Sequence, residues 1–237
     1  MKSSRLLVVV AVLAAAPATA GAADWRLGME ALTDLPLQAG GRWWVEAPYG
    51  FHLDTSLGSL PAGYVDLINS AVVGLGGYGE DTATLIASVV SSSLVWRVHV
   101  GWRPSAEWGF YFSGGYGMVA MDGEVGAGKL ILAVLGQKIA EGVPDANGSY
   151  GVSSTVHMID AEIGYMWSMI DDHLTVRLAL GFAGTVASET TIEPRFKPEY
   201  PSAVAEATRR SAEYLDGIYT KYLFLPVISV GVGYRYF

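Results

Sequence analysis

The final ten residues, Ile228-Ser-Val-Gly-Val-Gly-Tyr-Arg-Tyr-Phe237, alternate large apolar side chains with small or polar ones. Because a β-strand repeats every two residues, this alternation predicts a strand with one apolar face and one narrow face that carries the charge of Arg235. A soluble sheet rarely leaves such an aromatic strand at its edge, since that edge promotes aggregation. A barrel in a membrane has no free edge and needs an apolar outer face, so the segment favours a transmembrane β-barrel.

The segment resembles the closing strand of Gram-negative outer-membrane β-barrels, whose chains typically end in Phe with aromatic residues at alternate positions before it. Here the alternation is displaced by one residue, because Arg235 stands two positions before Phe237. The resemblance implies a small, eight-stranded outer-membrane barrel that contacts outer-membrane lipid. It also implies insertion by the barrel-assembly machinery through the C-terminal strand. It transfers no functional residue to this chain.

The first 20 residues have the composition of a secretory signal peptide. Lys2 and Arg5 form a positive region, residues 6–15 are apolar, and Ala18-Thr-Ala20 is a small-residue cleavage site. We expect cleavage after Ala20, with Ala22 or Ala23 as alternatives, and one barrel domain over residues 21–237. The expected location is the outer membrane of a Gram-negative bacterium.

Composition limits the classes of function. The net charge of −8 becomes −10 when the two positive residues Lys2 and Arg5 are removed, and this acidity argues against nucleic-acid binding. Cysteine is absent, and the histidines lack metal-ligand spacing, so we expect neither a metal nor a cofactor. Mean hydropathy is +0.32 with only 16% charged residues. No later segment offers about 18 uninterrupted apolar residues, so the apolar surface is expected on many short strands.

Alternation along the chain predicts an all-β, antiparallel, up-and-down barrel of eight strands. The expected strands cover residues 24–33, 38–47, 50–60, 94–104, 107–121, 152–168, 173–191 and 222–237. Short turns join some of them, and long loops at about 61–93, 122–151 and 192–221 join others. Short periplasmic turns and long extracellular loops are typical of outer-membrane barrels. A soluble barrel would show similar strands with its apolar faces inward, so the location of charge distinguishes the two.

The long loops show helical spacing of apolar residues. It predicts helical segments over 62–76, 81–93, 128–141 and 201–221. Water would penalise their apolar stripes, so we expect a helical cap above the barrel, or else a helix in the outer-leaflet interface. A self-packed cap would hide four residues that a ligand chamber would instead expose to its interior. They are Leu85, Val89, Leu130 and Val134.

Strand alternation directs one set of residues into the barrel and another toward lipid. The inward set is Arg26, Glu30, Arg42, Glu46, His52, Asp54, Arg97, His99, Arg103, Asp160, Glu162, Arg177 and Arg235. Eight strands enclose an interior just wide enough for side chains, so Arg–carboxylate pairs should close the lumen rather than form an ion path. The outward set forms two aromatic belts at the membrane interfaces. It contains Trp25, Trp43, Phe51, Trp96, Trp102, Trp108, Trp167, Tyr234, Tyr236 and Phe237.

One constellation resembles the start of an acid–base site: His52, Asp54, Arg97 and His99 on adjacent strands. A crowded lumen would admit neither lipid nor peptide, so we interpret these residues as part of the charge network and expect no enzyme. The expected function is a non-enzymatic structural or surface-interaction role. The alternatives are a narrow channel, binder or transporter for small apolar molecules, and a lipid-modifying enzyme.

Overall fold

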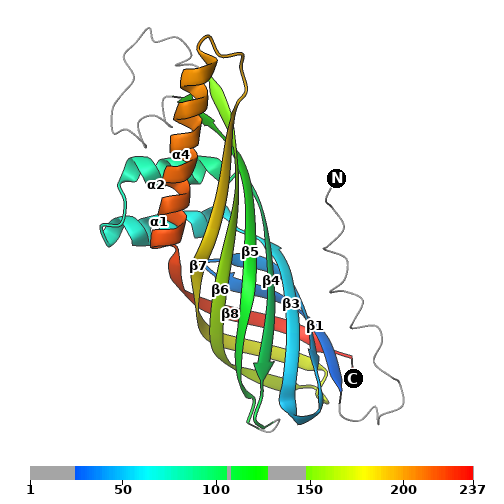
Figure 1. Ribbon diagram of the computed structural model, residues 1–237. Coiled ribbons are helices and arrows are strands. Elements are labelled where there is room, and N and C mark those ends of the chain that lie inside the picture. Colours follow the sequence, from blue (N-terminus) through cyan, green and yellow to red (C-terminus); the bar gives the residue numbers. More distant parts are fainter. Residues whose placement is uncertain (1–24, 106–107, 128–147, 237) are drawn as a thin grey trace.

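The computed structural model describes residues 25–105, 108–127 and 148–236, and in this part of the chain eight strands close into one barrel (Figure 1). Each strand pairs antiparallel with its neighbours in sequence, and the last pairs with the first. The eight-stranded antiparallel up-and-down barrel predicted from the sequence is therefore confirmed. The predicted signal peptide, the helix expected at 128–141 and Phe237 lie outside the described residues. The strands are β1 (Arg26–Leu35), β2 (Gln38–Glu46), β3 (Phe51–Ser59), β4 (Ser92–Trp102), β5 (Phe110–Gly126), β6 (Ser149–Met169), β7 (Leu174–Pro194) and β8 (Phe224–Arg235).

The strands differ in length, and three of them rise above the rest of the barrel. β5 has 17 residues and β6 and β7 have 21 each, whereas β1, β2 and β3 have 9 or 10. β8 begins opposite Gly184, so residues 185–194 of β7 pair with no strand of the described residues on that side. We call residues 123–126, 149–158 and 185–194 the extension. Both termini of the described chain lie at the other end, beside the short turns (Figure 1).

The extension lengthens three strands beyond their predicted limits. Residues 122–126 belong to a predicted loop, in which Asp122 and Glu124 are charged. In the structure both side chains are exposed on the outer face, while Met121 and Val125 are buried on the inner face. Alternation therefore continues beyond the closed ring of eight strands, with polar side chains on the outer face in place of apolar ones.

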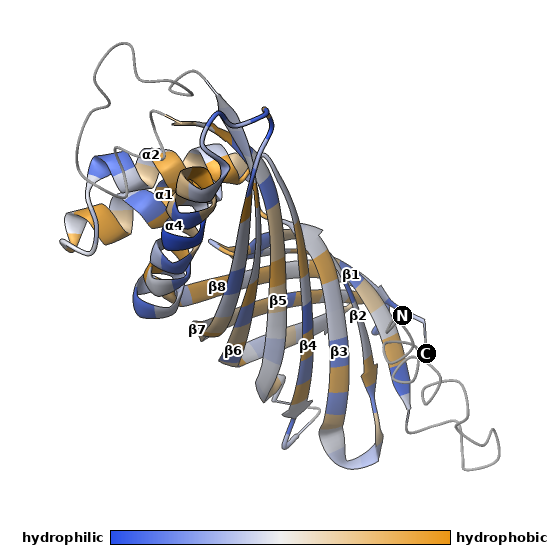
Figure 2. Cartoon of the chain, turned by 45° about the horizontal axis from the view of Figure 1, so that its top comes forward, coloured by the Kyte–Doolittle hydropathy of each residue, from blue (hydrophilic) through white to orange (hydrophobic). Residues whose placement is uncertain are grey.

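In the part of the chain that the structure describes, three α-helices cover the inner face of the extension, and the apolar core lies between them and the sheet. They are α1 (Ala62–Gly74), α2 (Glu80–Val89) and α4 (Pro201–Tyr222). Leu85, Val89 and Leu215 are 0% exposed and belong to one apolar cluster with Val125 and Val152 of the extension. The helices carry both apolar and polar segments (Figure 2), and their buried apolar residues include Ile68, Leu85 and Leu215. Within the described residues, none of the helices has the length and apolarity needed to cross a membrane.

α4 takes the place of a strand beside the unpaired edge of β7. Asp216 of α4 accepts hydrogen bonds from the hydroxyls of Ser188 and Thr190, both at 2.7 Å, and from the Thr190 backbone N–H at 3.3 Å. An unpaired strand edge is a template for aggregation, and a side chain that satisfies its donors protects it. The helix therefore both covers the core and shields an edge.

Candidate functional site: the barrel lumen

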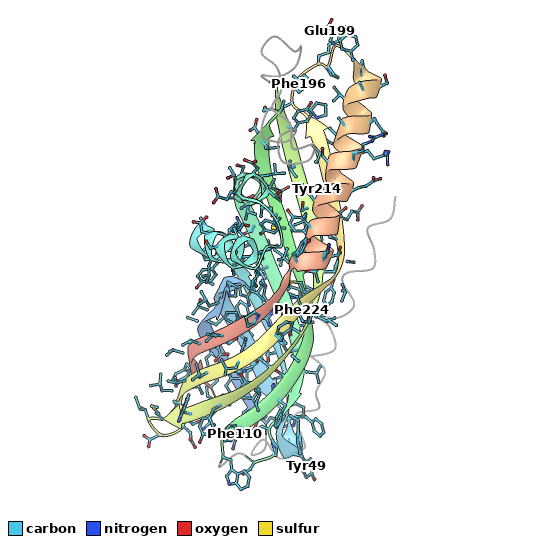
Figure 3. All side chains as sticks on the ribbon, turned by 90° about the vertical axis from the view of Figure 1, so that its left-hand side faces the viewer. Tyr49, Phe110, Phe196, Glu199, Tyr214 and Phe224 are labelled. Atoms are coloured by element: carbon cyan, nitrogen blue, oxygen red, sulfur yellow. The ribbon has the colours of Figure 1, made fainter. Side chains whose placement is uncertain are left out.

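The outer wall of the barrel is apolar over the strands that form the closed ring. Apolar residues dominate the outward positions there, and the outward Asp and Glu of the described strands begin only at the level of Asp122 and Glu189. Two exposed phenylalanines mark the height of this surface, Phe110 at the lower rim and Phe224 well above it (Figure 3). Apolar side chains outside and charged side chains inside are the arrangement of a membrane-spanning barrel, the opposite of a soluble one.

The predicted interfacial aromatic residues that the structure describes are all exposed, on the outer wall or beside it, with Trp108 in the turn before β5. Trp96 donates through its indole nitrogen to Thr55 at 3.0 Å, and Trp102 donates to the carbonyl of Tyr49 at 3.1 Å. An indole with one polar tip and an apolar body is suited to the boundary between lipid and water. The exposed members are Trp25, Trp43, Phe51, Trp96, Trp102, Trp108, Trp167, Tyr234 and Tyr236.

Arg42 lies at the centre of the lumen, where it is 1% exposed. Its guanidinium nitrogens lie 3.5 Å from Glu30, 3.6 Å from Asp34 and 3.5 Å from Asp54. Glu162 is the fourth carboxylate around it, at 3.9 Å. These are ion pairs longer than hydrogen bonds, so Arg42 acts as a shared counter-ion that balances several carboxylates at once.

Arg97 and His99 form the second half of the network, two positions apart on the inner face of β4. Arg97 donates to Asp34 at 2.5 Å and to Asp160 at 3.0 Å. The His99 ring lies between two carboxylates, with Nδ1 3.0 Å from Asp54 and Nε2 2.6 Å from Asp160. An imidazole with a proton on each nitrogen can donate to both. Charges from five strands therefore meet across the lumen.

The remaining predicted residues extend the network toward the end with the short turns. Arg177 lies 3.0 Å from Glu30, and its guanidinium lies 5.0 Å from the ring centre of Tyr111. Glu162 accepts from the hydroxyls of Tyr111 and Ser113, both at 3.1 Å. The inward residues that are buried are Glu30, Arg42, Glu46, His52, Asp54, Arg97, His99, Arg103, Asp160, Glu162 and Arg177.

Arg26 and Arg235 are not enclosed like the others but lie at the mouth of the lumen. The Arg26 side chain is 33% exposed and lies 3.3 Å from Glu46, which also accepts from Arg103 at 2.5 Å. Arg235 lies 3.2 Å from Asp172, a residue of the last short turn. Both arginines occupy the first or last strand position, so the barrel wall ends beside them.

The two histidines of the constellation considered in the sequence have different surroundings. His99 meets Asp54 and Arg97, but His52 does not join them. The His52 ring instead lies edge-on to Tyr111, 5.4 Å between ring centres, and its Nε2 has no hydrogen-bond partner among the described residues. His52 precedes Asp54 by two positions in β3, so it lies closer to the end of the barrel with the short turns. At that height its ring points away from the charge network.

Several inward residues that complete the site are not among the predicted ones. Asp34 lies one residue beyond the predicted strand 24–33, although it has the same parity as Glu30. It accepts hydrogen bonds from Gln38 at 2.7 Å and from Ser229 at 2.5 Å. With Asp34, the inward set contains six carboxylates (Glu30, Asp34, Glu46, Asp54, Asp160 and Glu162), equal in number to its six arginines. Extending the alternation to the end of each strand would have found it.

The network is suited to closing the lumen and is poorly suited to catalysis. His99 is 0% exposed, so no substrate can approach the ring as long as the barrel is closed. Among the described residues, no group of His, Asp and Glu has the arrangement of a metal site. The polar atoms are directed at one another, which is the role of a structural network.

Comparison with known proteins yields distant likenesses only. No family model matches the chain, and no curated protein matches it. Among solved structures, CarO2 of Acinetobacter baumannii is 14% identical with a TM-score of 0.38, covering 89% of this chain and 98% of that one. A major outer membrane protein from Thermus thermophilus is 14% identical with a TM-score of 0.43, covering 90% and 99%. These values are low, so the barrel fold rests on the strand pairing of this chain itself.

Proposed function

We propose that this protein is a non-enzymatic outer-membrane barrel that anchors a helix-covered sheet at the cell surface, with its lumen closed by charge pairing. The single observation that carries the proposal is the combination of an apolar outer wall with a buried network centred on Arg42 and Arg97. The lipid of the outer membrane is the partner of the wall. The short turns and both termini then face the periplasm, and the extension faces the outside.

Closure of the lumen is supported by what an ion path would require. A conducted ion must find a continuous polar route wide enough for its partly hydrated form, and eight strands leave room for little beyond side chains. Here the centre is occupied by Arg42, Arg97 and His99, each held by carboxylates of other strands. Opening a route would separate these pairs in a medium where unpaired charges are costly.

The packing of the helices α1, α2 and α4 supports a role in displaying the helix-covered sheet at the cell surface, rather than a role in transporting apolar molecules. Leu85 and Val89 have no exposed surface, which leaves no space beside them for even a water molecule. A chamber for an apolar ligand would be lined by such residues with a void between them. Leu130 and Val134 lie outside the described residues. In the part that the structure describes, the apolar stripes of the helices are used for packing.

Conductance in planar bilayers tests closure. We expect the purified protein to show no steady conductance, and the matched variant Arg209→Met on the outer face of α4 to behave in the same way. Arg42→Met together with Arg97→Met should admit transient current, since both central cations are then missing. A steady, high conductance of the unaltered protein would contradict closure and favour the channel.

A narrow channel is the second candidate, and one observation favours it. A cavity of about 420 Å³ opens into the lumen at the end with the short turns. It would serve as one entrance of a channel if the network above it separated. The bilayer measurement distinguishes the two, because a blind cavity passes no current.

A further inference from the structure

The cavity at the periplasmic mouth of the barrel is cationic, although the protein as a whole is acidic. Arg26, Arg103 and Arg235 line it, and Asp172 is the carboxylate among its lining residues. Glu46, deeper in the lumen, shares one oxygen between Arg26 and Arg103. Three guanidinium groups therefore face two carboxylates in a chain whose net charge is −8. Asp171 lies in the same turn as Asp172 but does not line the cavity.

Arg103 has hydrogen-bonding capacity that the described residues leave unused. Its Nη2 donates to Glu46 at 2.5 Å, whereas its Nε is buried and has no hydrogen-bond partner in the described part of the chain. A guanidinium has five N–H donors in a fork that matches a carboxylate or phosphate. Because Nε is closed to solvent, a group that enters the cavity can meet only the part of the guanidinium that lines the cavity wall.

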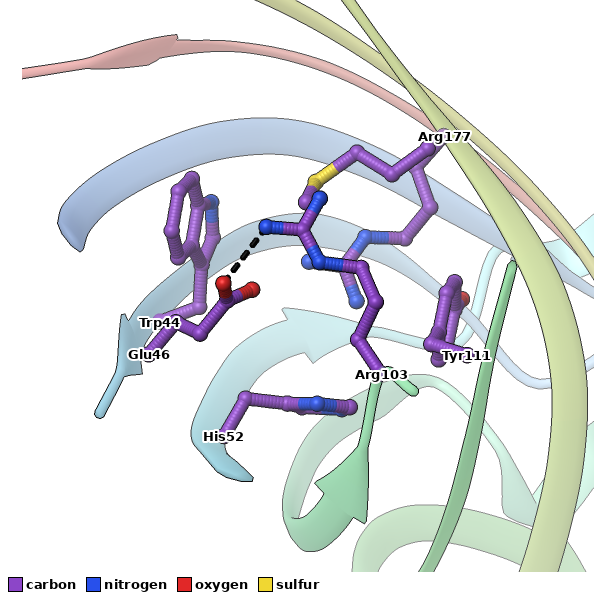
Figure 4. Close-up of a pocket in the computed structure, with 7 residues that line it drawn as sticks. Trp44, Glu46, His52, Arg103, Tyr111 and Arg177 are labelled. Carbon is purple, nitrogen blue, oxygen red and sulfur yellow. Dashed lines mark hydrogen bonds and ion pairs between the residues drawn. The ribbon is translucent and has the colours of Figure 1, made fainter. Parts of the chain in front are cut away.

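Next to this cavity lies a second layer of polar groups around a void of about 10 Å³ (Figure 4). Arg103 and Met166 line both spaces. The rings of Trp44, His52 and Tyr111 line the void, and Trp44 Nε1 and His52 Nε2 also lack hydrogen-bond partners among the described residues. Such a void is at the lower limit of what holds one water molecule, so the ligand itself must lie in the larger cavity.

Each of the three rings lies against a glycine on the neighbouring strand. A Cβ on Gly28 would lie 2.4 Å from the Trp44 ring, one on Gly101 2.3 Å from His52, and one on Gly164 2.4 Å from Tyr111. These glycines are the cross-strand neighbours of the three ring residues. Because glycine has no side chain, each ring can lie flat against the barrel wall. The lumen near the short turns is therefore less crowded than its centre.

We propose that this mouth is a binding site for a small organic anion, carrying a carboxylate or a phosphate, that enters from the periplasmic side. Arg103 and Arg235 hold the anionic group, Arg26 adds positive charge beside it, and the inward side chain of Met166 provides an apolar contact for the rest of the molecule. The site is separate from the central network, so binding and closure of the lumen are independent properties.

Calorimetric titration of the purified protein in a non-ionic detergent tests the site, with inorganic phosphate and benzoate as the two probes. We expect binding of at least one probe, weakened by added salt because the contacts are ionic. Binding of phosphate alone assigns a phosphate ligand, benzoate alone a carboxylate, and both a general anion site. Absence of heat for both probes at about 10 mM, where a Kd of about 1 mM would be evident, overturns the proposal.

Variants locate the site and keep the test valid if one of them fails to fold. Arg103→Gln and Arg235→Gln should each weaken binding about tenfold or more, the loss expected for a charged hydrogen bond. Arg209→Gln, which removes the same charge from the exposed face of α4, should leave binding unchanged. If Arg103→Gln does not fold, Arg235→Gln decides, because its partner Asp172 is exposed. An equal loss in Arg209→Gln would overturn the site.

Discussion

Replacing Arg97 by Met removes the cation that joins two carboxylates across the lumen, with little change of side-chain volume. Arg97 donates to Asp34 at 2.5 Å and to Asp160 at 3.0 Å, and it is 3% exposed. Removing one partner of a buried pair costs about 3–5 kcal/mol, because the other charge is left unbalanced. Asp34 keeps Gln38 and Ser229, and Asp160 keeps His99, so we expect the lower end, about 3 kcal/mol.

The assay is urea unfolding of the protein in lipid vesicles, followed by tryptophan fluorescence and by the gel mobility of unboiled samples. Arg209→Met serves as the control, because Arg209 is a surface cation whose pairs with Glu206 and Glu213 are exposed. Solvent screens such pairs, so we expect the control to unfold at nearly the same urea concentration as the unaltered protein.

A double-variant cycle tests whether the cost comes from the pair itself. Asp34→Asn removes the charge of the partner, and the double variant Arg97→Met/Asp34→Asn should cost about 1–3 kcal/mol less than the sum of the single changes. If Arg97→Met costs no more than Arg209→Met, or if the two sites are additive, the network does not stabilise the barrel.

Three further predictions concern the wall, the cap and the surface. Gly164→Ala would place a Cβ 2.4 Å from the Tyr111 ring and should lower the free energy of unfolding by about 1–3 kcal/mol in the same assay. The control Gly114→Ala, where the nearest atom to the new Cβ is 3.5 Å away, should change stability little, and equal effects of the two variants would refute crowding as the cause. Asp216→Ala leaves the hydroxyl donors of Ser188 and Thr190 without their acceptor. Limited proteolysis should then cut α4 away while the barrel keeps its gel mobility, and an α4 as resistant as in the unaltered protein would count against the role of Asp216 at the β7 edge. Hydrogen bonds from Arg209 and Arg210 lower the pKa of Glu206 to about 2 from an ordinary 4.5, so its contribution to stability is present above pH 4.5 and is lost as the pH falls toward 2. Carboxyl NMR titration should show this pKa, and Arg209→Gln should raise it; an unchanged pKa in that variant would exclude Arg209 as the main cause.

The sequence by itself determined the strands, their order in an antiparallel barrel and the face on which most side chains lie. These properties depend on a repeat of two residues, which is local and visible in any segment such as residues 228–236. It also identified the inward cations and carboxylates, apart from Asp34, because parity is all that inward orientation requires. The helical spacing of 62–76, 81–93 and 201–221 likewise corresponds to α1, α2 and α4.

Only the tertiary structure decided which of these charges meet. Arg97 and Asp160 are 63 residues apart and Ser229 and Asp34 are 195 apart, and their contact depends on strand register and tilt, which no local pattern specifies. The same holds for His52, whose parity matches Asp54 but whose height in the barrel directs it to Tyr111. A register shift at His157 and Met158 and the helix beside β7 shape the extension. The bulge and the position of the helix both depend on packing between segments that are distant in the chain, because the energies of burial and strand pairing are set by neighbours in space.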